Sequence, residues 1–397
     1  MSRSFFLWIL VIWRSKHVIV CGCVWLCMPM AFQIGAASAA DETIINAIAK
    51  NWAIQQEEVR SIKFSWKSAV TIPKGTVRTS EESKREARNA KDFFPEKDTT
   101  LEETNTLMVD KNNWRYETDG YGIDSSRREF ISQHSVTTSK DGIGKCYIPK
   151  GIYAYPLGNI VNMKGTDYPQ DISVRPLFQV FRSLRTGLFK SKEYTVLQDR
   201  GVVDGHSCLL LQTIAGISPK CCLWVDSERD YLVRRYTLSN EKGKVFLETT
   251  LSYSLTMKKR WLPSSWKVVN VNEQSDLAQS IISTVTDSAI NTPFDEHDFD
   301  ITFPPGTKVR DLRGETTGKE LTQYIAREGG EKRMITPQER RAPYEELLNT
   351  ESGQAIPTRR QWPFASSWFW LTSIGVFVGC LLLNVLRRVW KNRTTGR

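Results

Sequence analysis

Histidine and acidic side chains are the first residues to test for catalysis or metal binding. The sequence has four histidines, of which His297 lies in Glu296-His297-Asp298 and His134 lies in a predicted strand. A metal site needs ligands that converge from several elements, and the sequence has neither an HExxH motif nor paired CxxC motifs. We therefore interpret 296–298 as a solvated turn before a strand.

Motifs of nucleophilic and phosphate chemistry are also missing from the sequence. A serine hydrolase of the α/β type would carry a GxSxG elbow, and a phosphate-binding loop would carry GxxxxGK followed by Ser or Thr. Neither pattern occurs. The sequence therefore predicts a protein that is not an enzyme, with no catalytic residue, no metal and no cofactor.

Four cysteines lie in the part of the chain that we expect to be exported: Cys146, Cys208, Cys221 and Cys222. An even number of thiols in an exported domain is compatible with disulfides. Cys208 and Cys221 lie on successive predicted strands, so a bridge between them is conceivable, although their register is not clearly opposed. Buried free thiols are the preferred interpretation, because cysteine is among the most buried residues.

The positive charge of the chain is concentrated at its two ends. The net charge is +10, but three basic residues precede residue 41 and five follow residue 360. The segment 41–360 therefore has 46 basic against 44 acidic residues, a net charge of only +2. A nucleic-acid-binding domain would carry its basic excess on the folded part, so nucleic-acid binding is not predicted.

The first 40 residues predict a secretory signal peptide. They contain no acidic residue, and basic residues precede an apolar run at 18–34. The run is followed by Ala37-Ser38-Ala39, which matches the small-x-small cleavage pattern. An uncleaved membrane anchor is the alternative.

A second apolar run near the C-terminus predicts a membrane span at 361–388. Phe364–Leu386 carries no charge, and its 23 residues would reach about 34 Å as a helix. Arg387 and Arg388 follow it, which by the positive-inside rule places the tail 389–397 in the cytoplasm. The charged segment 313–360, with a short helix near 344–348, is then a juxtamembrane linker.

Between these ends the sequence predicts a mainly β fold. The segment 220–235 (KCCLWVDSERDYLVRR) is typical of a strand, a polar turn and a returning strand. Asp141-Gly142 and Asp204-Gly205 predict further hairpin turns, and Asp119-Gly120 is expected to form another. About ten strands joined by short turns indicate one large curved antiparallel sheet or an unclosed barrel.

Two helices and one insertion interrupt the predicted strands. Apolar residues at four-residue spacing predict a helix over 43–59, and a proline at the first turn predicts another over 176–187. A helix with so apolar a face is expected to cover the concave face of the sheet. The charged stretch 78–103 is interpreted as an insertion between strands.

Several short patterns resemble one known family. These are the opening strand with Trp66, LWVDSERDYLVRR at 223–235, WLPSSW at 261–266 and FDITFPPGTKVRD at 299–311. The order resembles the bacterial lipoprotein-carrier superfamily, with its LolA/LolB-like and RseB-like members. The resemblance covers roughly 41–312 and implies an unclosed barrel of about eleven strands, in which helices plug an apolar cavity that holds acyl chains. The membrane anchor and the insertion 78–103 depart from that pattern.

The predicted signal peptide and membrane span indicate a membrane-anchored, extracytoplasmic protein, and the resemblance implies that it binds lipid or lipoprotein acyl chains. The chain would sit in the bacterial inner membrane through Phe364–Leu386, with 41–360 in the periplasm. The alternative is a periplasmic sensor or scaffold that binds a protein partner and fills the barrel with its own side chains. The expected cavity residues are Phe64, Trp66, Leu177, Phe178, Phe181, Leu184 and Trp224.

Overall fold

The computed structural model describes residues 39–78, 93–124, 127–163, 168–169, 171–256, 260–271, 277–314 and 321–349. The predicted signal peptide, except for its last two residues, lies outside this range, as do the apolar run Phe364–Leu386 and the tail 389–397. Within the described range, no helix has both the length and the apolar character that a membrane crossing requires.

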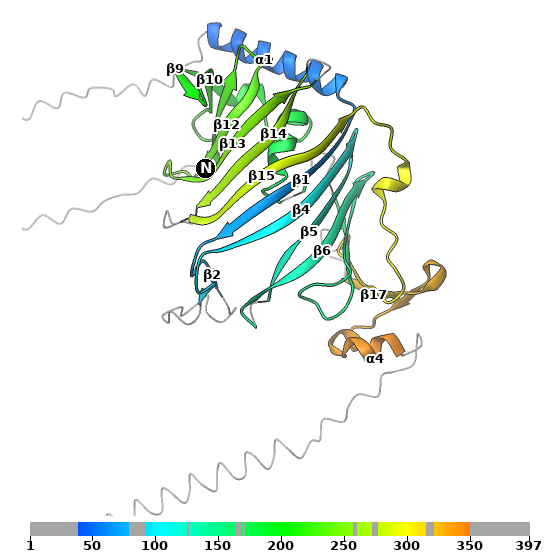
Figure 1. Ribbon diagram of the computed structural model, residues 1–397. Coiled ribbons are helices and arrows are strands. Elements are labelled where there is room, and N and C mark those ends of the chain that lie inside the picture. Colours follow the sequence, from blue (N-terminus) through cyan, green and yellow to red (C-terminus); the bar gives the residue numbers. More distant parts are fainter. Residues whose placement is uncertain are drawn as a thin grey trace, which may run out of the picture.

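One strongly curved, open sheet dominates the fold (Figure 1). Its order is β18-β17-β16-β8-β7-β6-β5-β4-β1-β15-β14-β13-β12-β11-β10-β9. The described part of the chain thus contributes 16 strands to this sheet, more than the ten or eleven predicted. The sheet is mixed rather than antiparallel throughout, because β16 runs parallel to β8.

The strands of the large sheet have the following bounds: β1 Ser61–Ile72, β4 Thr99–Asp110, β5 Asn113–Asp124, β6 Glu129–Lys140, β7 Ile143–Ile148, β8 Leu157–Asn162, β9 Tyr194–Val203, β10 His206–Thr213, β11 Lys220–Asp226, β12 Leu232–Ser239, β13 Val245–Leu255, β14 Trp261–Val271, β15 Leu277–Ile290, β16 Lys308–Asp311, β17 Thr322–Ala326 and β18 Lys332–Met334. Two short strands, β2 (Val77–Arg78) and β3 (Phe93–Phe94), form a separate pair.

Two predicted segment boundaries were wrong. The expected insertion 78–103 ends in regular strand, because β4 already begins at Thr99 and its first residues form the less buried half of that strand. The expected linker 313–360 contains β17 and β18, which extend the large sheet beyond residue 312. The short helix expected at its end is present as α4 (Tyr344–Asn349).

Both longer helices form where the sequence predicts them. Helix α1 (Ala39–Glu58) crosses one end of the strands (Figure 1). Helix α3 (Arg175–Phe181) begins with proline in its first turn, as predicted, but ends six residues before Gly187. Short 3₁₀ turns, each of three or four residues, lie at Ser191–Glu193 (η2), Glu296–Phe299 (η3), Glu328–Gly330 (η5) and Glu339–Arg341 (η6).

Three of the four predicted hairpins are confirmed. Asp141-Gly142 and Asp204-Gly205 adopt positive φ in tight turns, and β11 and β12 pair as expected. The turn predicted at Asp119-Gly120 was wrong, since β4 and β5 are joined at Lys111 and Gly120 lies inside β5. Gly120 instead permits close packing, because a Cβ there would stand 2.9 Å from Glu103 Oε1.

The main core lies between the sheet and the two helices. Its buried side chains come from α1, α3, β1, β4, β5 and β9 to β15, and include Ile48, Phe64, Trp66, Phe178 and Trp266. A smaller cluster around Val309 and Phe303 joins β8, β16 and β17. The concave face of the sheet is thus the side that α1 and α3 cover, as the sequence predicts.

Candidate binding site on the concave face

Aromatic side chains from the centre of the sheet form the floor of the concave face. Successive residues of β1 alternate between the two faces of the sheet, which places Phe64 and Trp66 together on the covered side. The ring centroid of Phe64 lies 5.5 Å from that of Phe181 on α3. Trp66 lies 6.0 Å from Tyr116 and 5.4 Å from Trp266.

Six of the seven predicted cavity residues meet on this face. Phe64, Trp66, Leu177, Phe178 and Phe181 are buried in the main core, and Leu184 packs against it. Phe64, Trp66 and Leu177 are fully buried and have no contact with solvent. At these positions the interior is filled by the protein's own side chains.

Trp224 was wrongly expected in the cavity. Leu223 and Val225 on either side of it are fully buried in the core, so the alternation of β11 turns Trp224 to the convex face. There Arg235 lies over the indole ring at 4.7 Å, and Gly201 on β9, two strands away, leaves room for it.

The conceivable disulfide between Cys208 and Cys221 is also wrong, and both thiols are free. Cys208 is paired with Asp226 in the β10–β11 ladder, whereas Cys221 lies five positions further along β11. Five strand residues span about 16 Å, far beyond the reach of a disulfide. Burial raises the pKa of each thiol to about 11, so both stay protonated at neutral pH.

A groove opens at the rim of the sheet, between the end of α1, the end of α3 and two hairpin turns. Its volume is about 310 Å³, and its apolar wall comes from Val59, Val180, Phe181, Leu232 and Trp261. Near its mouth, Arg260 forms a 2.6 Å ion pair with Glu58. Phe181 is shared between this groove and the aromatic floor, so only that ring and its neighbours separate the two.

Arg182 fixes the end of α3 to the beginning of the sheet. Its guanidinium donates to the carbonyl oxygens of Phe181 and Arg60, each at 2.8 Å. The side chain is 2% exposed, and burial lowers its pKa to about 10. A buried cation held by carbonyl groups ties the helix to β1 and positions Phe181 above Phe64.

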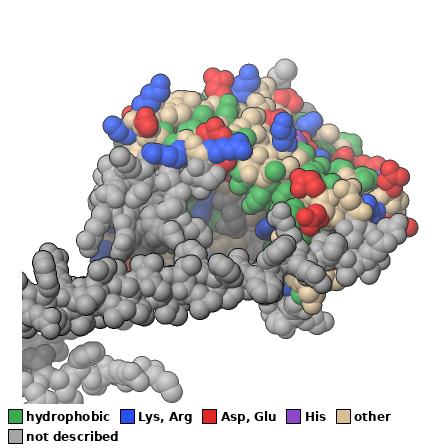
Figure 2. Space-filling view, turned by 90° about the horizontal axis from the view of Figure 1, so that it is seen from below, with side chains coloured by type: hydrophobic (Ala, Val, Ile, Leu, Met, Phe, Trp, Pro, Cys, Tyr) green, Lys and Arg blue, Asp and Glu red, His purple; other side chains and the backbone are tan. Residues whose placement is uncertain are grey.

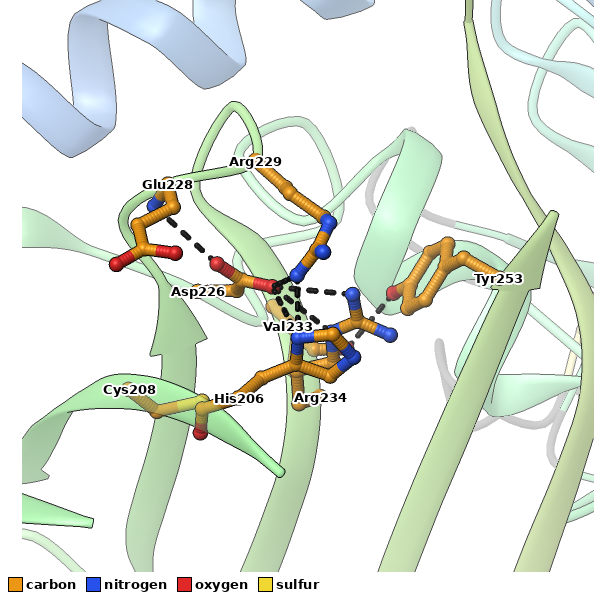
Figure 3. Close-up of polar contacts among 8 residues, drawn as sticks. All are labelled: His206, Cys208, Asp226, Glu228, Arg229, Val233, Arg234 and Tyr253. Carbon is orange, nitrogen blue, oxygen red and sulfur yellow. Dashed lines mark hydrogen bonds and ion pairs between the residues drawn. The ribbon is translucent and has the colours of Figure 1, made fainter. Parts of the chain in front are cut away.

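A charged cluster fixes the β11–β12 turn, which forms another wall of the groove (Figure 3). Asp226 Oδ2 accepts from Arg229 at 3.1 Å and from Arg234 at 3.0 Å, and His206 Nδ1 lies 3.9 Å away. These hydrogen bonds outweigh the effect of burial and hold the pKa of Asp226 below its usual value. Helix α1 docks on the turn because Trp52 Nε1 donates to the Tyr231 carbonyl at 2.9 Å.

A row of polar groups crosses the concave face beyond α3. Ser68 and Ser283 share a 2.9 Å hydrogen bond, and the Tyr116 hydroxyl lies 2.7 Å from Asn105 Oδ1. Glu103 is next on the same face of β4. Burial, with Asp171 nearby, raises its pKa to about 7. Seen from this end, a hollow with hydrophobic and charged side chains around its border opens under the sheet (Figure 2).

Replacing Glu103 with glutamine is expected to stabilise the protein at alkaline pH and to change little near pH 4. The folded state raises the pKa of this carboxyl group from 4.5 to about 7, so ionisation progressively destabilises the fold as the pH rises between these values. Glutamine does not ionise, so the variant does not lose stability in this way as the pH rises. Thermal unfolding at several pH values tests this, with the exposed Glu102→Gln as control. An equal effect at low and high pH would contradict it.

Sequence reasoning missed the residues that hold the site in place. Arg182 and Asp226 lie in stretches with ordinary composition, and their roles depend on partners far away in the chain, such as Arg60. Pairs of charged residues near a turn, as in Asp226 to Arg229, give the only local signal. Among the described residues, no three His, Cys, Asp or Glu side chains are grouped as metal ligands.

No family model and no curated protein matches this sequence. Its structure is similar to 31 solved chains. One is an outer membrane lipoprotein-sorting protein domain from Vibrio parahaemolyticus, with 13% identity and a TM-score of 0.37 over 64% of this chain and 94% of that one. Another is a LolA superfamily protein from Nitrosomonas europaea, with 8% identity and a TM-score of 0.34 over 64% and 97% of the two chains.

A third similar structure is MucB in complex with MucA(peri), with 11% identity and a TM-score of 0.23 over 65% of this chain and 60% of that one. The descriptions of two of these structures name a lipoprotein-sorting domain and the LolA superfamily. At TM-scores this low, similarity carries no function from one chain to the other. The function has to be inferred from this chain's own side chains.

Proposed function

We propose that this protein binds the acyl chain of a lipid or lipoprotein on the concave face of its sheet and has no catalytic role. One observation carries the proposal. The rim groove, of about 310 Å³, has an apolar wall within a partly polar lining, and that wall meets the aromatic floor at Phe181. Ligand pockets for small molecules start at about 300 Å³ and combine apolar walls with a few polar groups. A chain that enters the groove and displaces α3 would reach Phe64 and Trp66.

The energetics of the site suit an apolar ligand. Burial of apolar surface contributes roughly 25 cal/mol per Å² and needs no directed polar group. The groove wall offers Val180, Leu232 and Trp261 for such contacts. The short α3 is held largely by Arg182 and by side-chain packing, so it is the element best placed to move.

The location of the protein is part of the same proposal. The predicted signal peptide at 1–40 and the apolar run Phe364–Leu386 support an extracytoplasmic domain that is anchored in the inner membrane by one span. In that arrangement the binding domain would stay at the membrane surface and would receive or hold acyl chains there.

Native mass spectrometry of the full chain, released from a detergent micelle without added lipid, tests the proposal. We expect a co-purifying mass of a lipid or lipopeptide, and its loss in Phe181→Asp, which introduces a charge between the groove and the floor. Phe303→Asp, on the smaller cluster, is the matched control and should retain the ligand. A ligand-free mass that also takes up no added phospholipid would overturn the proposal.

A protein partner is the second candidate, and the filled interior favours it. Phe64, Trp66 and Leu177 have no exposed surface, as expected for a scaffold whose barrel is packed with its own side chains. The rim groove would then take an apolar side chain of the partner. Cross-linking at Ile54, which is exposed beside the groove, would distinguish the two candidates by capturing a peptide instead of a lipid.

A further inference from the structure

Helix α3 carries two polar residues, the half-buried Arg175 and the buried Gln179. Arg175 and Gln179 are one turn apart, so they lie on the same side of the helix. The helix contacts β12, where Tyr236 is paired with Thr249 of β13 across the ladder. Gln179, Tyr236 and Thr249 are 3%, 1% and 0% exposed.

These side chains bury polar atoms that the described part of the chain leaves poorly satisfied. Arg175 Nε and Gln179 Nε2 are buried without a hydrogen-bond partner there, and the Tyr236 and Thr249 hydroxyls have only each other. A buried polar group without a partner costs about 1–3 kcal/mol, and native proteins keep few of them. Two such donors on one helix, above a hydroxyl pair from two adjacent strands, indicate a place built for a ligand.

The charge at this place is positive. No carboxylate of the described residues forms an ion pair with Arg175, and its guanidinium lowers the pKa of Tyr236, Tyr194 and Cys221. Burial has the larger and opposite effect, and it raises the pKa of Tyr236 to about 12. The hydroxyl of Tyr236 therefore stays protonated and can donate a hydrogen bond. Arg175 is only half-buried, which leaves a route to its guanidinium.

We propose that Arg175, Gln179, Tyr236 and Thr249 form an anion-binding site under α3 that takes the negatively charged oxygen group of an amphiphile, a carboxylate or a phosphate. A guanidinium with neutral N–H and O–H donors is the set of groups that binds such oxygens most strongly. The proposal rests on the proposed acyl-chain function and adds to it the class of ligand, an anionic one. The acyl chain would lie on the apolar floor beside Phe178.

A fluorescent fatty acid and its neutral ester test this site. The full chain in a non-ionic detergent is titrated with cis-parinaric acid and with its methyl ester, which share the chain and differ in the carboxylate. We expect the acid to bind more tightly than the ester. Arg175→Met should weaken binding of the acid by at least about tenfold, the value of one charge-assisted hydrogen bond, and leave the ester unchanged. Arg175→Lys should restore most of the affinity.

Two further variants separate an effect on ligand binding from an effect on folding. Arg185→Met, an exposed arginine just beyond α3, should change neither affinity. Tyr236→Phe removes a hydroxyl that meets only Thr249, so the ligand-free protein should keep a melting temperature close to that of the parent, while binding of the acid weakens a few-fold. Competition by oleate or by dioleoyl phosphatidylglycerol, with dioleoylglycerol as the neutral control, tells a carboxylate from a phosphate.

The possible results of these titrations distinguish a failure of the anion site from a failure of acyl-chain binding itself. Equal binding of acid and ester, unaffected by Arg175→Met, would overturn the anion site and leave acyl-chain binding in place. An equal loss of both probes in Arg175→Met, with melting unchanged, would also overturn it. No binding of either probe to the parent chain would overturn both proposals.

Discussion

Replacing Asp226 with asparagine is expected to lower the free energy of unfolding by about 3 kcal/mol. The change keeps the shape of the side chain but removes the negative charge between Arg229 and Arg234. Arg234 is 5% exposed, and a buried charge that loses its partner typically costs 3–5 kcal/mol. The β11–β12 turn would loosen, and with it the docking of α1 through Trp52 and the Tyr231 carbonyl.

Urea unfolding of the full chain at neutral pH, followed by tryptophan fluorescence, measures this effect. Glu228→Gln is the matched control, because it changes an exposed carboxylate in the same turn and should shift stability by less than about 0.5 kcal/mol. Equal stability of Asp226→Asn and the parent would show that the cluster does not hold the turn.

The pH dependence of the parent chain follows from the same carboxylate. The folded pKa of Asp226 lies below its ordinary value of 3.8, so its contribution is complete at neutral pH. That contribution is lost as the pH falls below about 4 and through the folded pKa. Asp226→Asn should remove this part of the acid destabilisation, so the stabilities of the two proteins should converge at low pH.

Local sequence signals predicted the elements that depend on neighbouring residues. The turns at Asp141-Gly142 and Asp204-Gly205 formed because these residues tolerate positive φ, and α3 begins at Arg175 with Pro176 in its first turn, where proline is well suited. The same signal failed at Asp119-Gly120. There, glycine is present because the side chain of Glu103 on another strand packs against it. No local sequence pattern distinguishes a glycine in a turn from a glycine at a close contact inside a strand.

The pairing register of the strands decides which face and which neighbours a side chain has, and local sequence patterns do not determine it. Trp224 is apolar, but the phase of β11 turned it to the convex face, and Cys208 and Cys221 were separated by the pairing of β10 with β11. The groups of the candidate site are less predictable still. Arg175 and Tyr236 are 61 residues apart in sequence and meet only because α3 folds back onto β12.

The second large effect is expected for Phe181→Ala, which should weaken the ligand-free fold and improve its capacity for an apolar ligand. Truncating this buried ring removes its contact with Phe64 and should cost about 3–5 kcal/mol. It should also join the groove to the aromatic floor, because Phe181 lies between them. An apolar cavity of this kind stays dry and binds apolar molecules.

Thermal unfolding with and without a long-chain alcohol, such as 1-dodecanol, separates a ligand site from an ordinary core. In Phe181→Ala the alcohol should restore much of the lost stability, because a ligand that binds only the folded state stabilises it in proportion to its concentration and affinity. Phe303→Ala, the same truncation in the smaller cluster around Val309, should be destabilised without recovery. If both variants recover equally, the alcohol acts on the fold in general and the concave face has no special affinity. If only Phe181→Ala recovers, the aromatic floor beneath α3 is a place where an acyl chain can replace the protein's own side chains.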